Sequence, residues 1–285
     1  MEQVSFKNKK PTLFLVSTPI GNLDDITYRA VYTLKSVNIC FAEDTRTTGI
    51  LFKHYDIKTK LASYHEHQKY EKINEVLNYL ENGEDVALVS DAGTPGISDP
   101  GFELVGEVIK AGFYVVSIPG AVAGITALTS SGLQMQPHLF LGFLPRKESE
   151  IVSLLENYQD LNVTLIIYES PHRVSKTISY LHEVFGNKKI VIARELTKIY
   201  ETFIRTSLDE AINIEYNNKG EYVLIIENEV IVNTNKTIEE LYQEYKDKYL
   251  DEKELFKVIA TRLNISKKEV YRKLKIDNKA SCNNK

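Results

Sequence analysis

Apolar residues in the first half of the chain alternate between strand-like runs and helical spacing. Four short runs are almost continuously apolar, as buried parallel strands are. They are TLFLVS (12–17), NICFAE (38–43), VALVS (86–90) and FYVVSI (113–118). Between them apolar residues recur three and four positions apart, for example from Ile73 to Leu80, and Gly83 stands where that helix would end. This rhythm predicts a mostly parallel sheet that is covered by helices on both faces.

The second half of the chain is richer in strand-like runs. They are HLFLGF (138–143), NVTLIIYE (162–169), KKIVIARE (188–195), KIYETFIRT (198–206) and EYVLIIE (221–227). Helical spacing occurs at about residues 148–158 and 172–184. Only a short break separates the third run from the fourth, which is typical of an antiparallel hairpin. The pattern predicts a second α/β domain with a mixed sheet.

A helical and locally basic tail follows the last strand-like run. Two pairs have the spacing of capping boxes, which mark helix starts: Thr237 with Glu240 and Ser266 with Glu269. Residues 255–275 contain seven Lys or Arg residues and a single Glu. We therefore expect three parts, an N-terminal α/β domain, a second α/β domain and a basic helical module: 1–133, 134–230 and 231–285.

Composition narrows the class of protein. Of the 285 residues 43% are hydrophobic and 26% are charged, which suits a folded protein with two cores. The net charge of −4 argues against a generally polyanion-binding surface. Cys40 and Cys282 lie near no other Cys or His cluster, so we expect neither a disulfide nor a thiolate metal site, and a reducing cytoplasm fits. The opening residues lack the apolar core of a signal peptide, so export is not expected.

One long uncharged stretch has to be weighed as a membrane span. Residues 111–145 contain no Asp, Glu, Lys or Arg and would be long enough to cross a bilayer. Pro119, Gly120, Gly124 and Gly132 interrupt the stretch, which divides into strand, turn, helix and strand. Broken backbone is tolerated at membrane depth only under a protein cover. We therefore expect no membrane segment.

Loops rich in glycine and proline follow three strands of the first half. They are STPIGNLDD (17–25), DAGTPGISDPG (91–101) and SIPGAVAGITA (117–127). Glycine permits close backbone approach and proline stiffens the loop, and open α/β sheets bind ligands at this end of their strands. Each loop could also be a plain turn. Acidic residues such as Asp24, Asp25, Asp91 and Asp99 and the absence of Lys and Arg favour a neutral or cationic ligand, such as a positively charged nucleoside.

The sequence resembles the branch of the tetrapyrrole methylase family that methylates ribosomal RNA. The resemblance rests on nine runs in order over residues 12–227: LVSTPIGNLDDIT, AEDTRTT, HEH, ALVSDAGTPGISDPG, IPGAVAGITAL, GFLPRK, YESPHR, ARELTK and GEYVLII. It implies two α/β domains of the tetrapyrrole methylase type with a cofactor cleft between them, plus a small helical C-terminal module. The implied activity is S-adenosylmethionine-dependent 2′-O-methylation of a cytidine in 16S ribosomal RNA, near the decoding region. The implied protein is cytoplasmic, dimerises with itself and acts on the small subunit or a late assembly intermediate.

The resemblance and the loops together suggest residues for the cofactor. They are Pro19, Gly21, Asp91, Gly93, Thr94, Pro95, Ile97, Pro119, Gly120, Ala121, Val122, Ala123 and Tyr168. Members of the family usually have PGASA where this chain has PGAVA. A side-chain hydroxyl contact is therefore missing at Val122, although a backbone contact would survive.

Methylation of a hydroxyl requires a group that removes its proton. The candidates are Glu43, Asp44, Asp99 and His65, with Asp91 and His67 as further possibilities. Alternatively, Asp44 caps the helix that follows and forms a surface ion pair with Arg46. HEH at 65–67 lacks a third ligand at defined spacing, so we expect no metal.

Candidates for RNA phosphate contact lie near the loops and in the tail. They are Arg46, Arg146, Lys147, Arg173, Arg194, Lys198, Lys267, Lys268, Arg272 and Lys273. The alternatives are ordinary solvated charges and, for the tail, a small helical cap. Two rival functions also stay open, a methylase of the same fold that acts on a macrocycle and a non-catalytic RNA-binding assembly factor.

Overall fold

A computed structural model describes most of the chain. The described residues are 2–5, 7, 10–64, 69–98, 101–229, 236–247, 249, 251–263 and 265–277. The chain divides into two compact units. The larger comprises Met1–Glu156 and Val163–Glu227, and the smaller comprises Asn157–Asn162 and Asn228–Lys285. The candidate site lies entirely in the larger unit.

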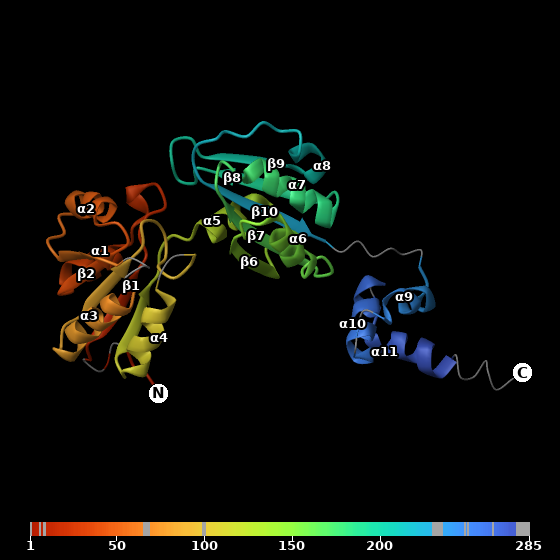
Figure 1. The fold of residues 1–285 in the computed structure, drawn as a ribbon, viewed down its shortest axis with the longest axis horizontal. Helices are drawn as coiled ribbons and strands as arrows, with labels where there is room; N and C mark the ends of the chain where they lie inside the picture. The colour runs from red at the N-terminus through yellow and green to blue at the C-terminus, as the bar shows by residue number, and fades with distance from the viewer. Residues whose placement is uncertain are drawn as a thin grey trace, which may run out of the picture. The chain divides into compact units, whose positions relative to one another are not determined.

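The first sheet of the larger unit is parallel and has the strand order β3-β2-β4-β1-β5. Its strands are β1 (Thr12–Val16), β2 (Ile39–Ala42), β3 (Lys60–Ser63), β4 (Val86–Val89) and β5 (Tyr114–Ile118). The helices between them are α1 (Tyr28–Ser36), α2 (Thr45–His54), α3 (Lys69–Glu81) and α4 (Phe102–Lys110). The short 3-10 helix η1 (Leu23–Asp25) precedes α1. Figure 1 shows this sheet and its helices in red to yellow.

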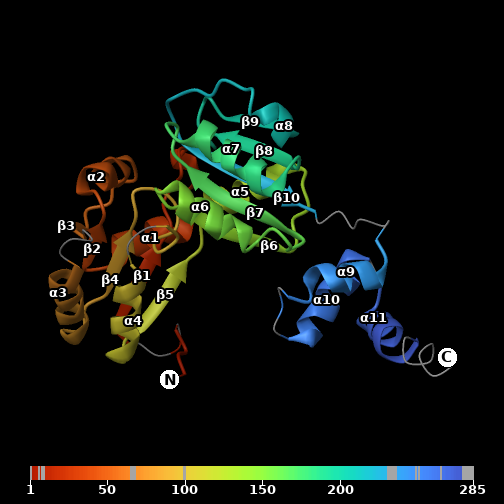
Figure 2. The ribbon, with the colours of Figure 1, turned by 45° about the vertical axis from the view of Figure 1, so that its right-hand side comes forward.

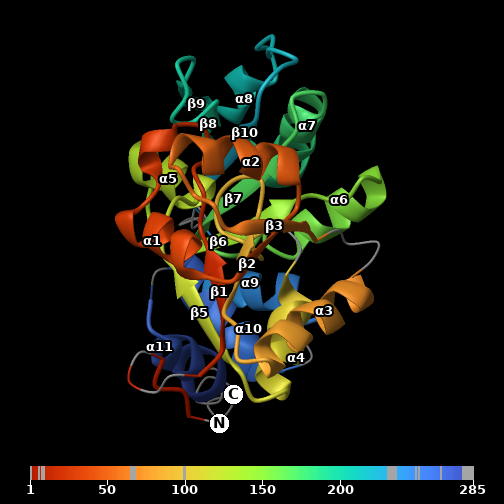
Figure 3. The same ribbon diagram turned by 90° about the vertical axis from the view of Figure 1, so that its left-hand side faces the viewer.

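Two hydrophobic cores cover the two faces of the first sheet. On one face Leu34 of α1 and Phe52 of α2 pack against the strands. On the other face Val76 of α3 and Leu104 of α4 do the same, and these two helices lie side by side (Figure 3). The apolar strands are buried on both sides, as the prediction of a helix-covered parallel sheet requires. That prediction is confirmed.

The second sheet is mixed and has the order β6-β7-β10-β8-β9. Its strands are β6 (His138–Phe143), β7 (Val163–Glu169), β8 (Lys189–Arg194), β9 (Thr202–Ser207) and β10 (Tyr222–Asn228). The associated helices are α5 (Ala123–Ser131), α6 (Glu148–Glu156), α7 (Val174–Phe185) and α8 (Leu208–Ala211). β6 and β7 are parallel, whereas β8 pairs antiparallel with both β9 and β10. The predicted hairpin and mixed sheet are confirmed, and α6 and α7 lie side by side on this sheet (Figure 2).

The two sheets of the larger unit share a core at the candidate site. Ile20, from the loop after β1, is buried in the same cluster as Ala127 of α5 and Ile166 of β7. Leu196, from the loop after β8, belongs to this cluster as well. Because one loop of the first sheet is buried in the core of the second, the site that they enclose has a fixed shape.

The smaller unit is a cluster of short helices. They are α9 (Ile238–Tyr245), α10 (Glu252–Arg262) and α11 (Lys267–Tyr271), which continues as a π-helical segment, Arg272–Asp277. Both predicted capping boxes are present, at Thr237 and Ser266. The apolar faces of these helices meet in a separate core around Phe256 and Ile259. No helix within the described part of the chain has the length and apolar character that a bilayer span needs.

Candidate functional site

Three loops leave adjacent strands of the first sheet at its carboxyl end. β4, β1 and β5 are neighbours in the sheet, so the loops that follow them begin side by side. Backbone hydrogen bonds join the first two loops: Thr18 N–H donates to the Gly93 carbonyl at 2.8 Å, and Gly93 N–H donates to the Thr18 carbonyl at 3.2 Å. This bridge holds the strand ends together beyond the sheet itself.

Hydroxyl groups extend the cross-links to the third loop. Ser17 Oγ and Thr94 Oγ1 lie 2.7 Å apart. Ser17 Oγ also lies 3.0 Å from the Ile118 carbonyl, and Thr94 Oγ1 lies 3.3 Å from the Ala121 carbonyl. All three loops are therefore held in one arrangement by the protein's own contacts.

Glycines make this close approach possible. Gly93 has φ +81°, in the left-handed region that side chains other than glycine adopt only with strain. A Cβ atom on Gly120 would lie 2.6 Å from Ser17 Cβ, so only glycine lets the third loop lie on the first. The glycines of the second and third loops thus allow these loops to pack closely against the first.

A cavity of about 370 Å³ is bounded by these loops and by the ends of strands of the second sheet. Eight residues that the sequence suggested line it: Glu43, Asp91, Gly93, Thr94, Ile97, Val122, Ala123 and Tyr168. Six others lie outside the lining: Pro19, Gly21, Pro95, Pro119, Gly120 and Ala121. Two of these, Gly120 and Ala121, do not line the cavity but support the loops that do. Gly120 packs on Ser17, and the Ala121 carbonyl lies within hydrogen-bond distance of Thr94 Oγ1.

The second sheet supplies lining residues that sequence reasoning did not single out. They are Phe143, Glu169, Ser170, Pro171, Leu196, Gly220, Glu221, Tyr222 and Val223. Because β8 and β10 are antiparallel, the end of β8 and the start of β10 reach the same edge of the sheet. The signal that could have found them is the position of the runs GFLPRK, YESPHR, ARELTK and GEYVLII at strand ends.

The charged groups of the lining are acidic. Glu43, Asp91, Glu169 and Glu221 line the cavity, and none of the described lining residues is Lys or Arg. Asp91 is oriented by the Asp44 N–H, which donates to its Oδ1 at 3.0 Å. Such a cavity favours a ligand that carries positive charge.

Glu169 and Tyr168 at the end of β7 are held by several hydrogen bonds. The buried Glu169 carboxylate accepts from Thr177 Oγ1 at 2.6 Å and from Ser170 N–H at 2.7 Å. The Tyr168 hydroxyl accepts from Gly124 N–H at 2.8 Å, near the start of α5. These bonds fix the wall of the cavity that faces the glycine-rich loops.

The structure separates the candidate proton acceptors. Glu43, at the end of β2, lines the cavity, whereas Asp44 does not. Asp44 caps α2 and pairs with Arg46 at 2.7 Å, as the alternative interpretation held. Hydrogen bonds from the Arg46 side chain and backbone lower the pKa of Asp44 to about 2, which makes it a weak base. Asp99, His65 and His67 lie outside the described residues.

No metal site occurs among the residues that the structure describes, where no group of three His, Cys, Asp or Glu side chains could hold an ion. Cys40 is buried, which raises the pKa of its thiol, and Cys282 lies outside the described residues. The described lining of the cavity offers carboxylates, hydroxyls and backbone groups.

Two of the candidate phosphate-binding cations, Arg173 and Lys198, have side chains that are only 32% and 30% exposed. Arg173 donates to the Leu144 carbonyl at 3.3 Å and to the Pro145 carbonyl at 2.6 Å, and its Nε lies 3.6 Å from Glu169 Oε1. Lys198 donates to Glu195 Oε1 and to Glu221 Oε2, each at 2.9 Å. These contacts give both side chains a structural role.

The remaining cation candidates are more open to solvent. Arg46 is 90% exposed and Arg194, which is half-buried, donates to the Lys219 carbonyl at 3.0 Å. The others are exposed: Arg146, Lys147, Lys267, Lys268, Arg272 and Lys273. These side chains could reach RNA phosphates without breaking a buried contact.

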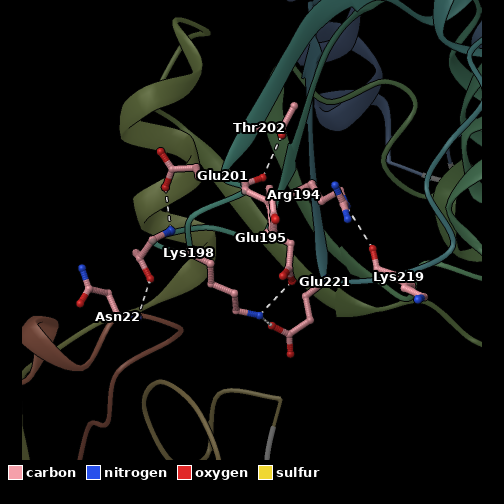
Figure 4. A network of polar contacts seen from close by, with 10 residues as sticks. Asn22, Arg194, Glu195, Lys198, Glu201, Thr202, Lys219 and Glu221 are labelled. Carbon is pink, nitrogen blue, oxygen red and sulfur yellow. Dashed lines mark hydrogen bonds and ion pairs between the residues drawn. The ribbon is translucent and has the colours of Figure 1, made fainter.

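The network around Lys198 joins the loop after β8 to the loop after β1 (Figure 4). Thr197 Oγ1 accepts from the Asn22 N–H at 3.0 Å, and Thr197 N–H donates to Glu201 at 2.7 Å. Glu195 and Thr197 have φ values of +52° and +65°, so the turn between them is strained. The ion pairs of Lys198 join this strained turn to Glu221, just before β10, whereas Thr197 joins it to the first loop.

Charge stabilises the network in a pH-dependent way. The hydrogen bond from Lys198 lowers the pKa of Glu195 below its ordinary value. Burial acts to lower the pKa of Lys198, but its hydrogen bonds to Glu195 and Glu221 outweigh burial and raise that pKa. Because the pKa of Glu195 is depressed, its contribution is present above the ordinary carboxyl pKa and is lost as the pH falls through the lowered value.

We expect Lys198→Met to lower the free energy of unfolding by about 1–2 kcal/mol at pH 7. The loss should shrink as the pH falls through the lowered pKa of Glu195, because this carboxylate then becomes protonated in the parent protein as well. Urea unfolding at neutral and acidic pH measures it. Lys147→Met removes a more exposed pair with Glu150 and should cost under about 0.5 kcal/mol. Equal losses in the two variants would contradict a structural role for Lys198.

Comparisons with known proteins agree with this architecture. The profile described as Tetrapyrrole (Corrin/Porphyrin) Methylases matches residues 12–212. The Ribosomal RNA small subunit methyltransferase I of Streptococcus pyogenes serotype M3 (strain ATCC BAA-595 / MGAS315) is 44% identical, over 94% of this chain and 97% of the relative. The protein of the same description from Bacillus subtilis (strain 168) is 44% identical, over 94% and 96%. A crystal structure of uroporphyrin-III-C-methyltransferase from Thermus thermophilus superposes with a TM-score of 0.56 at 16% identity, over 77% of this chain and 95% of that one, and shows the common fold.

Proposed function

This chain belongs to the tetrapyrrole (corrin/porphyrin) methylase family, and from that premise we propose that it methylates the 2′-hydroxyl of a cytidine in 16S ribosomal RNA, near the decoding region. It is an S-adenosylmethionine-dependent methyltransferase of ribosomal RNA. Its proposed substrate is the small ribosomal subunit or a late assembly intermediate. Its proposed working form is a cytoplasmic homodimer.

The acidic cavity supports S-adenosylmethionine as the cofactor. Three cross-linked loops and the second sheet enclose a cavity whose described charged groups are all carboxylates. S-adenosylmethionine is a nucleoside with a positively charged sulfonium and an ammonium group, so it fits the sign of this cavity. When bound, it supplies an electrophilic methyl group. The choice of a ribosomal RNA as acceptor follows from the relatives.

The residues that would hold the cofactor are those of the loops and of the facing wall. Gly93 and Thr94 line the cavity in a shape fixed by Thr18 and Ser17. Ala123, at the start of α5 after the third loop, lines the same cavity. Because the protein's own hydrogen bonds position these groups, little loop ordering has to accompany binding.

We propose that Glu43 accepts the proton of the ribose hydroxyl. A sugar hydroxyl is a poor nucleophile while it keeps its proton, and a carboxylate within hydrogen-bond reach can remove it. Glu43 lines the cavity at the end of β2, whereas the neighbouring Asp44 is committed to Arg46 and to the cap of α2. The rest of the catalytic effect comes from alignment of the hydroxyl with the donor.

Exposed cations are proposed to hold the RNA backbone. We expect alanine at four tail positions to weaken binding to small subunits and to flatten its salt dependence by up to ~0.7 in log–log slope for each phosphate that the variant no longer neutralises. The positions are Lys267, Lys268, Arg272 and Lys273. Affinity for S-adenosylmethionine should not change, because all four lie outside the unit that contains the cavity. Filter binding over a salt series measures the effect.

A control variant removes four exposed lysines from the helices and loops of the first sheet. They are Lys35, Lys53, Lys58 and Lys110. The net charge changes equally, so a general electrostatic effect would weaken binding in both variants. Equal weakening would contradict a specific role for the tail.

The experiment that tests the function is mass spectrometry of 16S ribosomal RNA from a strain that lacks the gene. The proposal requires loss of one 2′-O-methylcytidine and its return when the gene is restored. The variant Glu43→Gln should fail to restore it. An unchanged set of modified nucleosides would overturn the proposal.

A further inference from the structure

Phe143 is an exposed aromatic residue on the lining of the cavity. It ends β6, and 56% of its surface is exposed. Exposed apolar residues are common on proteins and mean little alone. The contacts that hold this ring at the cavity indicate that it has a function.

A β-bulge turns Phe143 toward the cavity side of the second sheet. Phe140 pairs with Ile166 and Phe143 pairs with Tyr168, so three steps along β6 match two steps along β7. In a regular strand, residues three apart point to opposite faces, but the extra residue puts both phenylalanines on one face. Gly142 sits in the bulge with φ +65°, which glycine adopts without strain.

The side chain of Tyr168 contacts both phenylalanine rings. Its ring lies 4.8 Å from Phe140 and 5.7 Å from Phe143 between centroids, with interplanar angles of 69° and 70°. These are edge-to-face contacts, which favour a definite ring orientation. The hydroxyl of Tyr168 is itself fixed by Gly124 N–H. Phe143 is therefore held in place while more than half of its surface stays open.

The charges nearby indicate what this surface can bind. The described charged residues of the lining are carboxylates, so the lining itself offers no cation to a phosphate group. A nucleotide over the lining is attracted through its base, whereas its phosphates would be held by cations outside the lining, such as Arg146 and Lys147. Aromatic side chains are the usual partners of unstacked bases in single-stranded RNA.

The size of the cavity separates this surface from the cofactor. A volume of about 370 Å³ lies near the lower end of the ~300–1,000 Å³ of small-molecule sites, so it has room for one small ligand. A second ligand has to bind at the opening. Phe143 is the aromatic residue of the lining that is mostly exposed, since Tyr168 is half-buried and Tyr222 is 3% exposed.

We propose that Phe143 is the platform on which the base of the target nucleotide stacks while its ribose is presented for methylation. This inference rests on the proposed function and deepens it. Phe143 is a substrate-positioning residue, and the bulge at Gly142 exists to aim it. A flat ring selects an unstacked base without reading its hydrogen-bonding edge, so Phe143 contributes affinity rather than the choice of cytidine.

The test compares Phe143→Ala, Phe143→Trp and the control Phe102→Ala in the full-length protein. Phe102, at the start of α4, is 83% exposed and does not line the cavity. The measurements are kcat and KM with small subunits from a strain that lacks the gene, and the affinity for S-adenosylhomocysteine by calorimetry. We expect Phe143→Ala to raise the KM for subunits about tenfold or more. Phe143→Trp should stay within about threefold of the parent, and the affinity for S-adenosylhomocysteine should stay within about twofold in all variants.

Two results would overturn the inference. One is an unchanged KM in Phe143→Ala. The other is a loss of affinity for S-adenosylhomocysteine as large as the rise in KM, because the ring would then serve the cofactor. Nucleoside analysis of the parent's product keeps the two proposals apart: methylation of another nucleotide would refute the cytidine target, while the comparison of variants would still decide the role of Phe143.

Discussion

Gly93→Val will weaken the binding of S-adenosylmethionine by about a hundredfold or more. Gly93 has φ +81°, and a β-branched residue is strongly disfavoured there. A Cβ atom at this position would already touch Ile20 Cγ2 at 3.4 Å and the Ala121 carbonyl at 3.6 Å, so the added methyl groups have to displace a neighbouring loop. Relief of the strain would break the bridge to Thr18. Calorimetry with the folded variant measures the affinity.

Gly83→Val is the matched control for backbone strain. Gly83 has φ +83° at the end of α3, and no atom lies within 4 Å of an added Cβ. We expect this variant to lose stability but to bind S-adenosylmethionine as the parent does. Unaltered binding by Gly93→Val, or equal loss in both variants, would refute the idea that the shape of the second loop makes the site.

Glu43→Gln will reduce kcat by about 10²–10⁴ while it leaves the affinity for S-adenosylmethionine nearly unchanged. Glutamine preserves the size of the side chain but cannot accept the proton. Single-turnover rates at saturating S-adenosylmethionine, with calorimetry for its affinity, provide the two measurements.

Asp44→Asn separates the two neighbouring carboxylates. Asparagine caps helices about as well as aspartate, so α2 should stay intact. The pKa of Asp44, lowered to about 2 by its hydrogen bonds from Arg46, makes this carboxylate a poor proton acceptor near neutral pH. We expect a rate within about threefold of the parent. A larger loss in Asp44→Asn than in Glu43→Gln would show that the proton had been assigned to the wrong residue.

Local pattern was enough to predict most of the fold. The buried strands β1, β2, β4 and β5 read as apolar runs because both of their faces are covered. β3 (Lys60–Ser63) was missed, because this edge strand is short and only half-buried and so has no continuous apolar run. The order of the strands depends on long-range pairing, which periodicity does not encode.

Only the part of the site that glycine- and proline-rich loops form could be predicted from the sequence. The loop around Gly93 was found because its glycines and prolines follow a strand. Arg173 and Lys198 were predicted as phosphate ligands, and some of their intramolecular partners could not be predicted because these are distant in sequence. Arg173 donates to the Leu144 carbonyl 29 positions away, and Lys198 pairs with Glu221 23 positions away.

The position of Phe143 shows a second limit of sequence reasoning. Alternation in β6 predicts that Phe140 and Phe143 face opposite sides. One extra residue reverses this, and the register with β7 alone reveals it. The run GFLPRK contains the glycine that permits the bulge, but a glycine near a strand end has many other uses.

A crystal structure with S-adenosylhomocysteine would decide whether the three loops of the first sheet form the binding site of the methyl donor in advance of binding. We expect the ligand in the cavity that Gly93, Ala123 and Tyr168 line, with the Thr18–Gly93 and Ser17–Thr94 contacts preserved. A ligand bound elsewhere, or bound only after these contacts have broken, would contradict it.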